Sequence, residues 1–349
     1  MFKGIYTALA TPFLSQENDK LQSFDIPKRY SYDFALCKSF DKYINTLNYN
    51  INNKNDVVKS SEDEDDITVN LNTFSILLKS QIEQEVDGVI VGGSTGEGWS
   101  LSKREYISML KLAVNLTNNT KVKIIANCNG NMTKDVVENA KICSEIGVNN
   151  IMCVIPYYNK PSQNCIFHHF KNIHDEVPDV NIMLYSVPSR TGSDFETSTI
   201  LKLSELPRIV SFKDSSSNIT RILEIKERLD KNNMTVLCGN DNEFIPFSAS
   251  GADGLVSVIS NIIPEVIIKI YKAVCANDYT KALKLYRKTI MLSNALMLDT
   301  NPIMIKYALS YISNGYFANL MRMPLLSLND KDKIDKINTA IELFKFDEQ

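Results

Sequence analysis

The segment IVSFKDSSSN, residues 209–218, decides the fold. A run of β-branched and aromatic residues ends there in a single lysine, Lys213, which is followed by Asp214 and three serines. A run that is apolar at nearly every position is typical of a strand buried on both faces of a parallel sheet. Similar runs recur along the chain at GIYTALA (4–10), DGVIVGG (87–93), KVKIIANC (121–128), NNIMCVIP (149–156), VNIMLYS (180–186), MTVLCGN (234–240) and DGLVSVIS (253–260).

Helical segments alternate with these runs. SKREYISMLKLAVNLT (102–117) begins with Ser102 as a candidate N-cap, and TKDVVENAKICSEIG (133–147) extends from Thr133 as cap to Gly147 as stop. The alternation predicts an α/β fold, a closed (β/α)8 or TIM barrel, with an open doubly wound sheet as the alternative. The loop GGSTGEGWS (92–100) lacks the third glycine of a dinucleotide fingerprint and the lysine of a P-loop, which argues against the alternative.

Two regions do not fit the repeating pattern. Residues 15–66 hold six asparagines between Asn45 and Asn55 and an acidic block at 62–66, a composition that buries little apolar surface. We interpret 15–66 as a long insertion after the first strand. Strand signals stop near residue 275, so we expect a catalytic barrel at 1–275 and a C-terminal helical domain at 276–349.

The composition favours a protein that acts on small molecules. The net charge of −3 at pH 7 provides no global field that attracts nucleic acid or an anionic membrane. No apolar stretch reaches the roughly 18 residues that span a bilayer, and the N-terminus lacks the pattern of a signal peptide. Seven scattered cysteines without a Cys-x-x-Cys pair suit a reducing compartment. We therefore expect a cytoplasmic protein without membrane or nucleic-acid partners.

The reacting groups of such a barrel gather at the carboxyl ends of its strands. Lys213 ends one run, where apolar surroundings favour the free amine that forms a Schiff base with a ketone. Tyr185 ends the neighbouring run, and its phenol is placed to transfer protons. Taken alone, each residue also fits an ordinary role, Lys213 as a salt-bridging lysine and Tyr185 as a packed aromatic.

Other predicted strand ends carry polar or aromatic side chains. Arg190 lies in a turn where its planar guanidinium suits a carboxylate, although a surface arginine is the ordinary interpretation. Ser94 and Thr95 lie among glycines that let backbone amides approach an anion. Tyr157 and Tyr158 are adjacent aromatics, which fit an interface as well as catalysis.

The histidines do not indicate a metal centre. His168, His169 and His174 fall on one helical stretch, with no acid or cysteine placed to complete a metal site. We therefore expect no metal, and we expect these three side chains on the surface.

Together these motifs resemble the pyruvate-dependent Schiff-base aldolases of the dihydrodipicolinate synthase and N-acetylneuraminate lyase superfamily. The resemblance covers nearly the whole chain outside 15–66. It is carried by TALATPF (7–13), GGSTGEG (92–98), PYYNKPSQ (156–163), YSVPSRTG (185–192), FKDSS (212–216), CGND (238–241) and GADGLVSVISN (251–261).

The resemblance implies four catalytic residues. Lys213 would form the imine with pyruvate, and Tyr185 would relay protons above it. Ser94 would hydrogen-bond this relay. Tyr158 would reach into the site of a neighbouring subunit to complete the relay, which implies a homodimer or homotetramer.

The resemblance also implies substrate contacts and a reaction. Thr95 would bind the pyruvate carboxylate, Arg190 would receive the carboxylate of aspartate semialdehyde, and the backbones of Gly239 and Val256 would lie near the lysine. The implied reaction condenses pyruvate with L-aspartate 4-semialdehyde to 4-hydroxy-tetrahydrodipicolinate, in diaminopimelate and lysine biosynthesis. The imine nitrogen is the electron sink, so no diffusible cofactor is needed.

Two alternatives stay open. Ser94, in the GGSTGE form typical of sialic acid lyases, and KDSS (213–216) fit an N-acetylneuraminate lyase or a 2-keto-3-deoxy sugar-acid aldolase that releases pyruvate. Arg190 opposes these reactions, because the resembling sialic acid lyases lack an arginine there. The other alternative is a catalytically silent barrel that serves as a binding scaffold.

The resemblance further implies an interface pocket for the effector lysine, formed by Asn131, Asp135 and Tyr157. Bacterial relatives have smaller residues or histidines at the positions of the neighbouring Trp99, Lys103 and Tyr106. Because a lysine side chain repels a cationic effector, we expect weak or absent inhibition by lysine.

Overall fold

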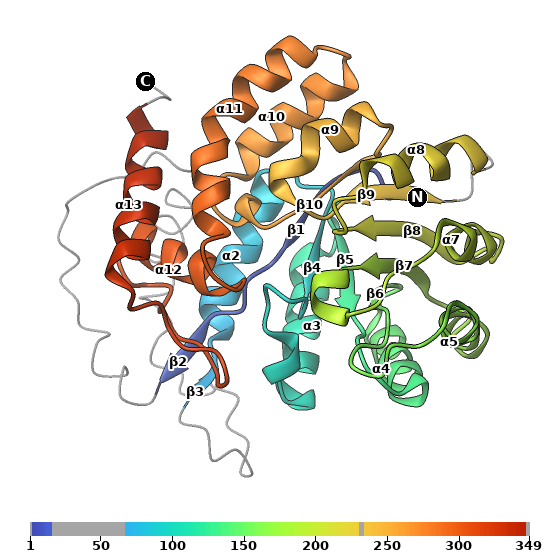
Figure 1. Cartoon of the computed structure of the whole chain (residues 1–349). Helices are drawn as coiled ribbons and strands as arrows, with labels where there is room; N and C mark the ends of the chain where they lie inside the picture. Colours follow the sequence, from blue (N-terminus) through green and yellow to red (C-terminus); the bar gives the residue numbers. More distant parts are fainter. Residues whose placement is uncertain (1, 16–66, 230–233, 347–349) are drawn as a thin grey trace.

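In the described residues of the computed structural model, 2–15, 67–229 and 234–346, eight parallel strands close into a barrel (Figure 1). The order around the barrel is β1-β10-β9-β8-β7-β6-β5-β4, and β4 pairs with β1. The strands are β1 (Gly4–Ala8), β4 (Gly88–Val91), β5 (Lys123–Asn127), β6 (Asn150–Val154), β7 (Asn181–Ser186), β8 (Ile209–Asp214), β9 (Thr235–Cys238) and β10 (Gly254–Ser257). Each lies within one of the predicted runs, so the TIM barrel is confirmed and the open sheet is wrong.

Helices follow the strands along the chain. They are α2 (Leu71–Glu83), α3 (Lys103–Thr117), α4 (Thr133–Ile146), α5 (Gln163–Glu176), α6 (Pro188–Thr191), α7 (Thr197–Ser204), α8 (Ile219–Arg228), α9 (Phe244–Ala249) and α10 (Pro264–Cys275), with short 3-10 helices η3 (Gly98–Ser100), η4 (Asp241–Glu243) and η5 (Ile259–Asn261). Ser102 caps α3 in a capping box with Glu105, and Gly147 ends α4 in the left-handed conformation, as predicted.

Two sequence-based expectations near α4 and α5 were wrong. Thr133 is the first residue of α4 rather than its cap, which is Met132. The Thr133 hydroxyl instead shares a 2.9 Å hydrogen bond with Nδ1 of His169. His169 is buried at 6% exposure, because this residue of α5 faces α4 rather than solvent.

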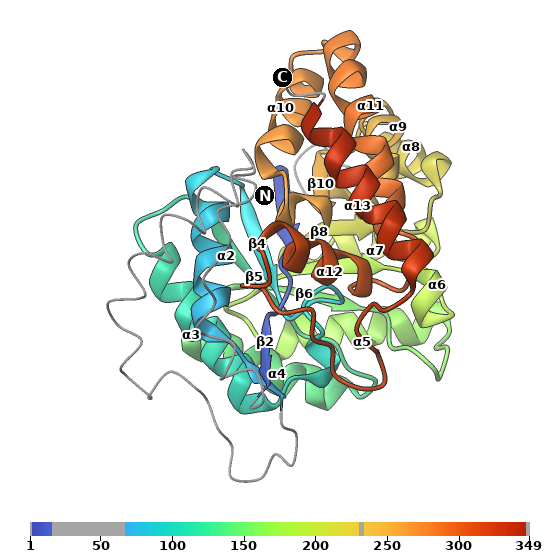
Figure 2. The same cartoon turned by 90° about the vertical axis from the view of Figure 1, so that its left-hand side faces the viewer.

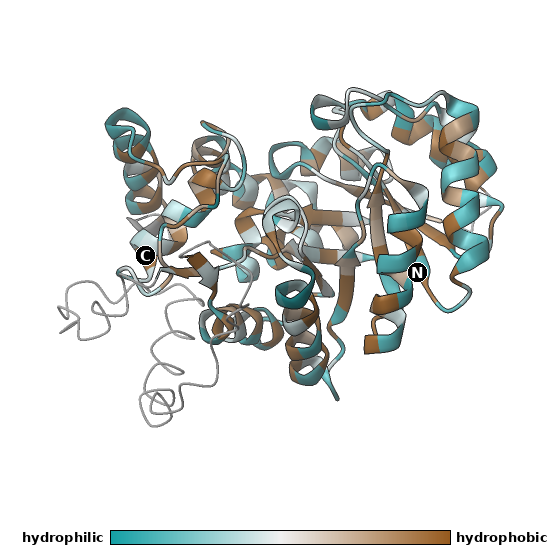
Figure 3. Cartoon of the chain, turned by 90° about the horizontal axis from the view of Figure 1, so that it is seen from below, coloured by the Kyte–Doolittle hydropathy of each residue, from teal (hydrophilic) through white to brown (hydrophobic). Residues whose placement is uncertain are grey.

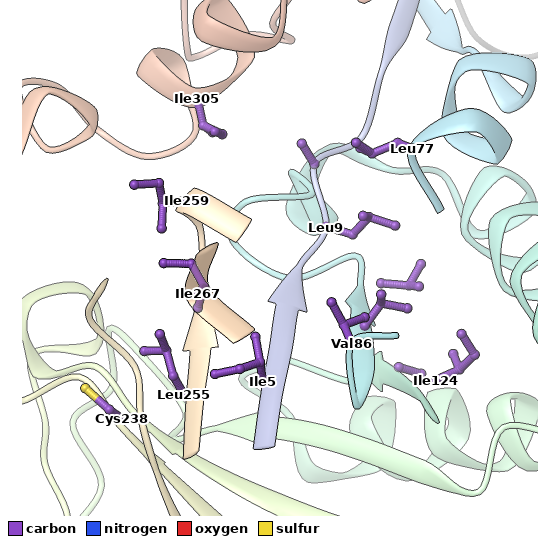
Figure 4. Packing of buried hydrophobic residues seen from close by; sticks show 14 of the residues in the cluster. Ile5, Leu9, Leu77, Val86, Ile124, Cys238, Leu255, Ile259, Ile267 and Ile305 are labelled. Carbon is purple, nitrogen blue, oxygen red and sulfur yellow. The ribbon is translucent and has the colours of Figure 1, made fainter. Parts of the chain in front are cut away.

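The barrel separates two apolar layers. On β7, Ile182 and Leu184 pack outward against the helices, while Met183 and Tyr185 point into the barrel interior. Ile5 of β1 belongs to the outer layer (Figure 4). Viewed from below, hydrophobic strands lie among helices that alternate hydrophobic and hydrophilic residues (Figure 3). Because strand side chains alternate between the two layers, sequence position decides which residues reach the interior.

The chain continues after α10 with α11 (Tyr279–Leu296), α12 (Ile303–Ile312) and α13 (Lys331–Phe346). Figures 1 and 2 show α13 beside α11 and α12. We keep residue 275, the last residue of α10, as the proposed end of the barrel domain. No helix within the described ranges is long and apolar enough to cross a membrane.

A short antiparallel ribbon lies beyond the barrel and was not predicted. It pairs β2 (Phe13–Ser15) with β3 (Ile67–Val69), and Ser15 is the register partner of Ile67. The proposed insertion at 15–66 falls almost entirely outside the described residues. The ribbon pairs the described residues on either side of 16–66.

Candidate active site

A cavity of about 450 Å³ opens at the carboxyl ends of the barrel strands. Its wall includes Ser94 from the loop after β4, Tyr157 after β6, Tyr185 at the end of β7 and Arg190 from α6. The closed barrel therefore brings together residues that lie far apart in the sequence. Four of the sequence-predicted candidates line one cavity.

Lys213 and Tyr185 face each other inside the barrel. They are register partners on β8 and β7, and each side chain is 6% exposed. Nζ of Lys213 lies 3.9 Å from the centroid of the Tyr185 ring. The amine is therefore held in a mostly apolar interior against a phenol, which is an arrangement suited to forming an imine beside a proton carrier.

The wall beside Lys213 comes from β9 and β10. Val256 is buried in the interior layer that includes Tyr185. Gly239 donates a 2.7 Å backbone hydrogen bond to the Asp214 carbonyl, and a Cβ there would lie 2.0 Å from Oγ of Ser215. A Cβ there would also lie 3.0 Å from the Asp214 carbonyl oxygen, so glycine suits a position where the chain passes this close to the strand end that carries Lys213.

Asp241, which the sequence reasoning did not single out, lies near this wall. Burial raises the pKa of Asp241, while hydrogen bonds and the charge of Lys213 act in the opposite direction. Its Oδ2 accepts hydrogen bonds from the amides of Val258 and Ile259, and its buried Oδ1 has no partner within the described part of the chain. The sequence signal was its position in CGND (238–241), directly after a strand.

The loop after β4 presents two hydroxyl groups. Ser94 lines the cavity, and Thr95 is buried at 2% exposure. Oγ1 of Thr95 accepts a 2.9 Å hydrogen bond from the side-chain amide of Asn301. Gly98 lets the loop fold back, because a Cβ there would lie 1.8 Å from the carbonyl oxygen of Gly92.

Arg190 is exposed at the edge of the cavity. It lies in α6, a single turn that begins with Pro188 at its first position. Its Nη2 donates a 3.0 Å hydrogen bond to the Asn301 carbonyl oxygen. Asn301 therefore contacts both Thr95 and Arg190, two of the predicted substrate-binding residues. The sequence analysis did not assign a role to Asn301, which lies in TNP (300–302).

Tyr158 does not enter this cavity. Its side chain is 90% exposed, and its backbone φ of 71° lies in the left-handed region that non-glycine residues seldom adopt. Tyr157 is 41% exposed and lines the cavity, and its amide donates to Oδ1 of Asn131 at 3.2 Å. Asp135 is exposed in the first turn of α4.

A buried ion network lies behind the loop after β4. Lys306 pairs with Glu97, and the Arg322 guanidinium binds both carboxylate oxygens of Glu105 at 2.6 and 2.8 Å. The Phe13 ring lies 4.0 Å from Nζ of Lys306 and 4.7 Å from the Arg322 guanidinium carbon. Burial lowers the pKa of Lys306 to about 8, although Glu97 opposes this shift. The network ties the loop to the C-terminal helices and to the ribbon.

A resident metal ion has no evident ligand set. Within the described ranges, no group of three or more His, Cys, Asp or Glu residues could hold one.

The family model for the dihydrodipicolinate synthetase family matches residues 57–342. This chain belongs to that family. The resemblance stated from the sequence motifs is therefore confirmed. Among curated relatives, the 4-hydroxy-tetrahydrodipicolinate synthase of Rickettsia bellii is 40% identical over 280 residues, which cover 80% of this chain and 94% of the relative.

Solved structures of the family share the fold. The 4-hydroxy-tetrahydrodipicolinate synthase of Methylacidiphilum fumariolicum SolV superimposes with a TM-score of 0.81 at 27% identity, covering 99% of this chain and 97% of that chain. A chloride-inhibited dihydrodipicolinate synthase from Acinetobacter baumannii, in complex with pyruvate, gives a TM-score of 0.80 at 26% identity and covers 99% of both chains.

Proposed function

We propose that this chain condenses pyruvate with L-aspartate 4-semialdehyde to 4-hydroxy-tetrahydrodipicolinate, a step of diaminopimelate and lysine biosynthesis. The observation that carries the proposal is the buried amine of Lys213, 3.9 Å from the Tyr185 ring in the barrel interior. Family membership supports it, as do the curated relatives named 4-hydroxy-tetrahydrodipicolinate synthase.

The reaction needs no diffusible cofactor. The Lys213 amine attacks the keto carbon of pyruvate, water leaves, and the imine that forms loses a methyl proton to give an enamine. The enamine carbon attacks the aldehyde of aspartate semialdehyde. The amine of that substrate then displaces Lys213 by transimination, which closes the ring and returns the free lysine.

The other candidates have distinct tasks in this proposal. Tyr185 relays the protons that imine formation adds and removes, with Ser94 as its hydrogen-bonding neighbour. Thr95 binds the pyruvate carboxylate. Arg190 at the cavity edge receives the carboxylate of the aldehyde substrate, which suits its planar array of donors.

We also propose that the active unit is a homodimer or homotetramer in which Tyr158 completes the site of a neighbouring subunit. Tyr158 is 90% exposed, and Trp99, which lines the cavity, is 48% exposed, so both leave large apolar surfaces uncovered. Sedimentation analysis of wild type and Tyr158→Ala, with turnover measured in parallel, tests this assembly. A fully active monomer contradicts it.

Reduction with borohydride in the presence of pyruvate tests the enzymatic proposal. We expect a mass gain that maps to Lys213 and is absent in Lys213→Arg. A silent barrel that serves as a scaffold gains no mass, and a label on another residue also contradicts the proposal.

An aldehyde panel then identifies the reaction. We expect turnover with aspartate semialdehyde. Release of pyruvate from N-acetylneuraminate or a 2-keto-3-deoxy sugar acid instead favours the lyase alternative, which the lyase-like Ser94 supports.

A further inference from the structure

Arg221 of α8 is buried outside the barrel, behind the end of β8, and is 3% exposed. Its Nε and Nη2 bind the two carboxylate oxygens of Asp214 at 3.0 and 2.6 Å. Its Nη1 donates to Asp194 at 2.8 Å and to the Phe195 carbonyl at 3.0 Å, and Nη2 also reaches Oγ of Ser216 at 2.6 Å. One guanidinium therefore joins two carboxylates and two further oxygens.

The same guanidinium also reaches the end of β7. Its Nη2 lies 3.5 Å from Oγ of Ser186, and that hydroxyl donates to Asp194. Ser186 and Asp214 are register partners, and each directly follows a member of the interior pair, Tyr185 and Lys213. Because neighbouring side chains on a strand point to opposite faces, Arg221 holds the outer pair while the inner pair points into the barrel interior.

Attraction between the Arg221 guanidinium and the carboxylates of Asp214 and Asp194 holds this cluster together. Although burial lowers the pKa of Arg221, its bonds to Asp214 and Asp194 raise it overall, so the guanidinium remains charged. Its donors lie in one rigid plane, which a lysine cannot reproduce. A buried carboxylate such as Asp214, which is fully covered, would lose both of its bonds to Nε and Nη2 if Arg221 were replaced.

We propose that Arg221 is a positioning residue that fixes the ends of β7 and β8 so that the Lys213 amine stays over the Tyr185 ring. This inference rests on the proposed function, in which these two side chains form the imine. Arg221 does not touch the substrate. It sets the geometry of the residues that do, and a small misplacement of reacting groups lowers the rate strongly.

A matched control lies on the same helix. Nζ of Lys226 in α8 binds Oδ2 of Asp253 at 2.7 Å, and that oxygen also accepts the amide of Val236 in β9. This ion pair holds α8 to the barrel without contacting Ser186 or Asp214. Lys226→Met therefore reports what loosening of α8 alone does to the protein.

The test compares Arg221→Lys, Ser186→Ala and Lys226→Met with wild type in melting temperature, kcat, KM and the rate of borohydride trapping with pyruvate. We expect Arg221→Lys to lower both the trapping rate and kcat at least about tenfold, while its KM for the aldehyde stays within about twofold of wild type. We expect Lys226→Met to lower the melting temperature but to be trapped with pyruvate at the wild-type rate. Equal trapping by folded Arg221→Lys and Lys226→Met, or losses that follow melting temperature in every variant, overturns the inference.

If Arg221→Lys does not fold, Ser186→Ala decides, because it removes a single hydroxyl from the cluster. We then expect trapping to slow about threefold, and an unchanged rate overturns the inference. If borohydride and pyruvate never label the wild-type protein, the proposed function itself is contradicted. If they label the wild-type protein and the variants at the same rate, only the role of Arg221 is contradicted.

Discussion

The side-chain amide of Asn301 donates a 2.9 Å hydrogen bond to Oγ1 of Thr95. A residue that precedes α12 thereby reaches the loop after β4, across 206 positions of sequence. A threonine hydroxyl that accepts from an amide keeps its own proton for another acceptor. In the proposed reaction, this proton is the one that Thr95 donates to the pyruvate carboxylate.

Replacing Asn301 tests this contact. Asn301→Asp keeps the shape of the side chain but exchanges the donor for an acceptor, so the Thr95 hydroxyl donates its proton to residue 301 instead of to the substrate. We expect kcat/KM for pyruvate to fall about tenfold, the value of one hydrogen bond in the transition state, and Asn301→Ala to act similarly. Thr300→Ala, at the exposed neighbouring position, serves as the control in steady-state assays. Wild-type kinetics in both Asn301 variants would remove any role for the contact.

Arg190 should separate the two substrates. Without its guanidinium, the carboxylate of the aldehyde loses a charge-assisted hydrogen-bonding partner, so we expect Arg190→Ala to raise KM for aspartate semialdehyde by about thirtyfold. Trapping of pyruvate on Lys213 should persist, because the imine forms in the interior of the barrel. Ser189→Ala in the same turn is the control. Equal loss of trapping and aldehyde use would mean that Arg190 supports the whole site rather than one substrate.

The barrel strands could be predicted from the sequence because both faces of each strand are covered. Continuous apolar runs such as IVSF (209–212) mark such strands without further information. The ribbon of β2 and β3 escaped prediction, because each strand has three residues and the pairing joins Ser15 to Ile67. Hydrophobic periodicity cannot reveal strands of three residues or a pairing between segments so far apart in the sequence.

The strand order predicted that the inner residues of the site lie together. It did not predict the residues that hold them and the neighbouring loop in place. Lys213 and Tyr185 end consecutive strands, so a barrel must bring them together. Asn301 and Lys306 belong to the C-terminal region, and only the folded chain shows that they contact the loop after β4. Arg221 was not singled out in the sequence, because nothing local reveals which oxygens its donors meet.

The buried pair of Glu97 and Lys306 should behave as a unit. Lys306→Met leaves a fully buried carboxylate without its cation, which we expect to cost about 3–5 kcal/mol in the free energy of unfolding. The double variant Glu97→Gln/Lys306→Met removes both charges and should be more stable than Lys306→Met alone. Urea unfolding measures this coupling, and Lys336→Met, which breaks an exposed pair with Asp332, should change stability little. Additive losses in the double variant would contradict the pairing.

Regulation by lysine should be weak. Lys103 lines the cavity with Trp99 and Tyr106, so a second ammonium group entering there meets a like charge. We expect half-inhibition only at millimolar lysine, and we expect Lys103→Ala to strengthen it. Lys111→Ala, an exposed change on the same helix, should leave inhibition unchanged. An inhibition constant in the micromolar range for wild type would overturn this expectation.

His169 should make the protein less stable in acid. Burial lowers the pKa of His169 to about 4, against 6.5 for the exposed ring. Between these values the unfolded chain binds a proton that the folded chain does not, so the stability present above pH 6.5 is lost as the pH falls toward 4. The contribution is on the order of 3 kcal/mol across that window. Its buried Nε2 has no hydrogen-bonding partner among the described residues, which fits a neutral ring.

The test is urea unfolding between pH 7 and pH 4 with three chains, wild type, His169→Gln and His168→Gln. We expect wild type and His168→Gln to lose the same stability over this range, because His168 is exposed. His169→Gln should lose less, since glutamine takes up no proton there, even if it is less stable than wild type at pH 7. Parallel curves for His169→Gln and wild type would mean that the His169 ring gains its proton without unfolding.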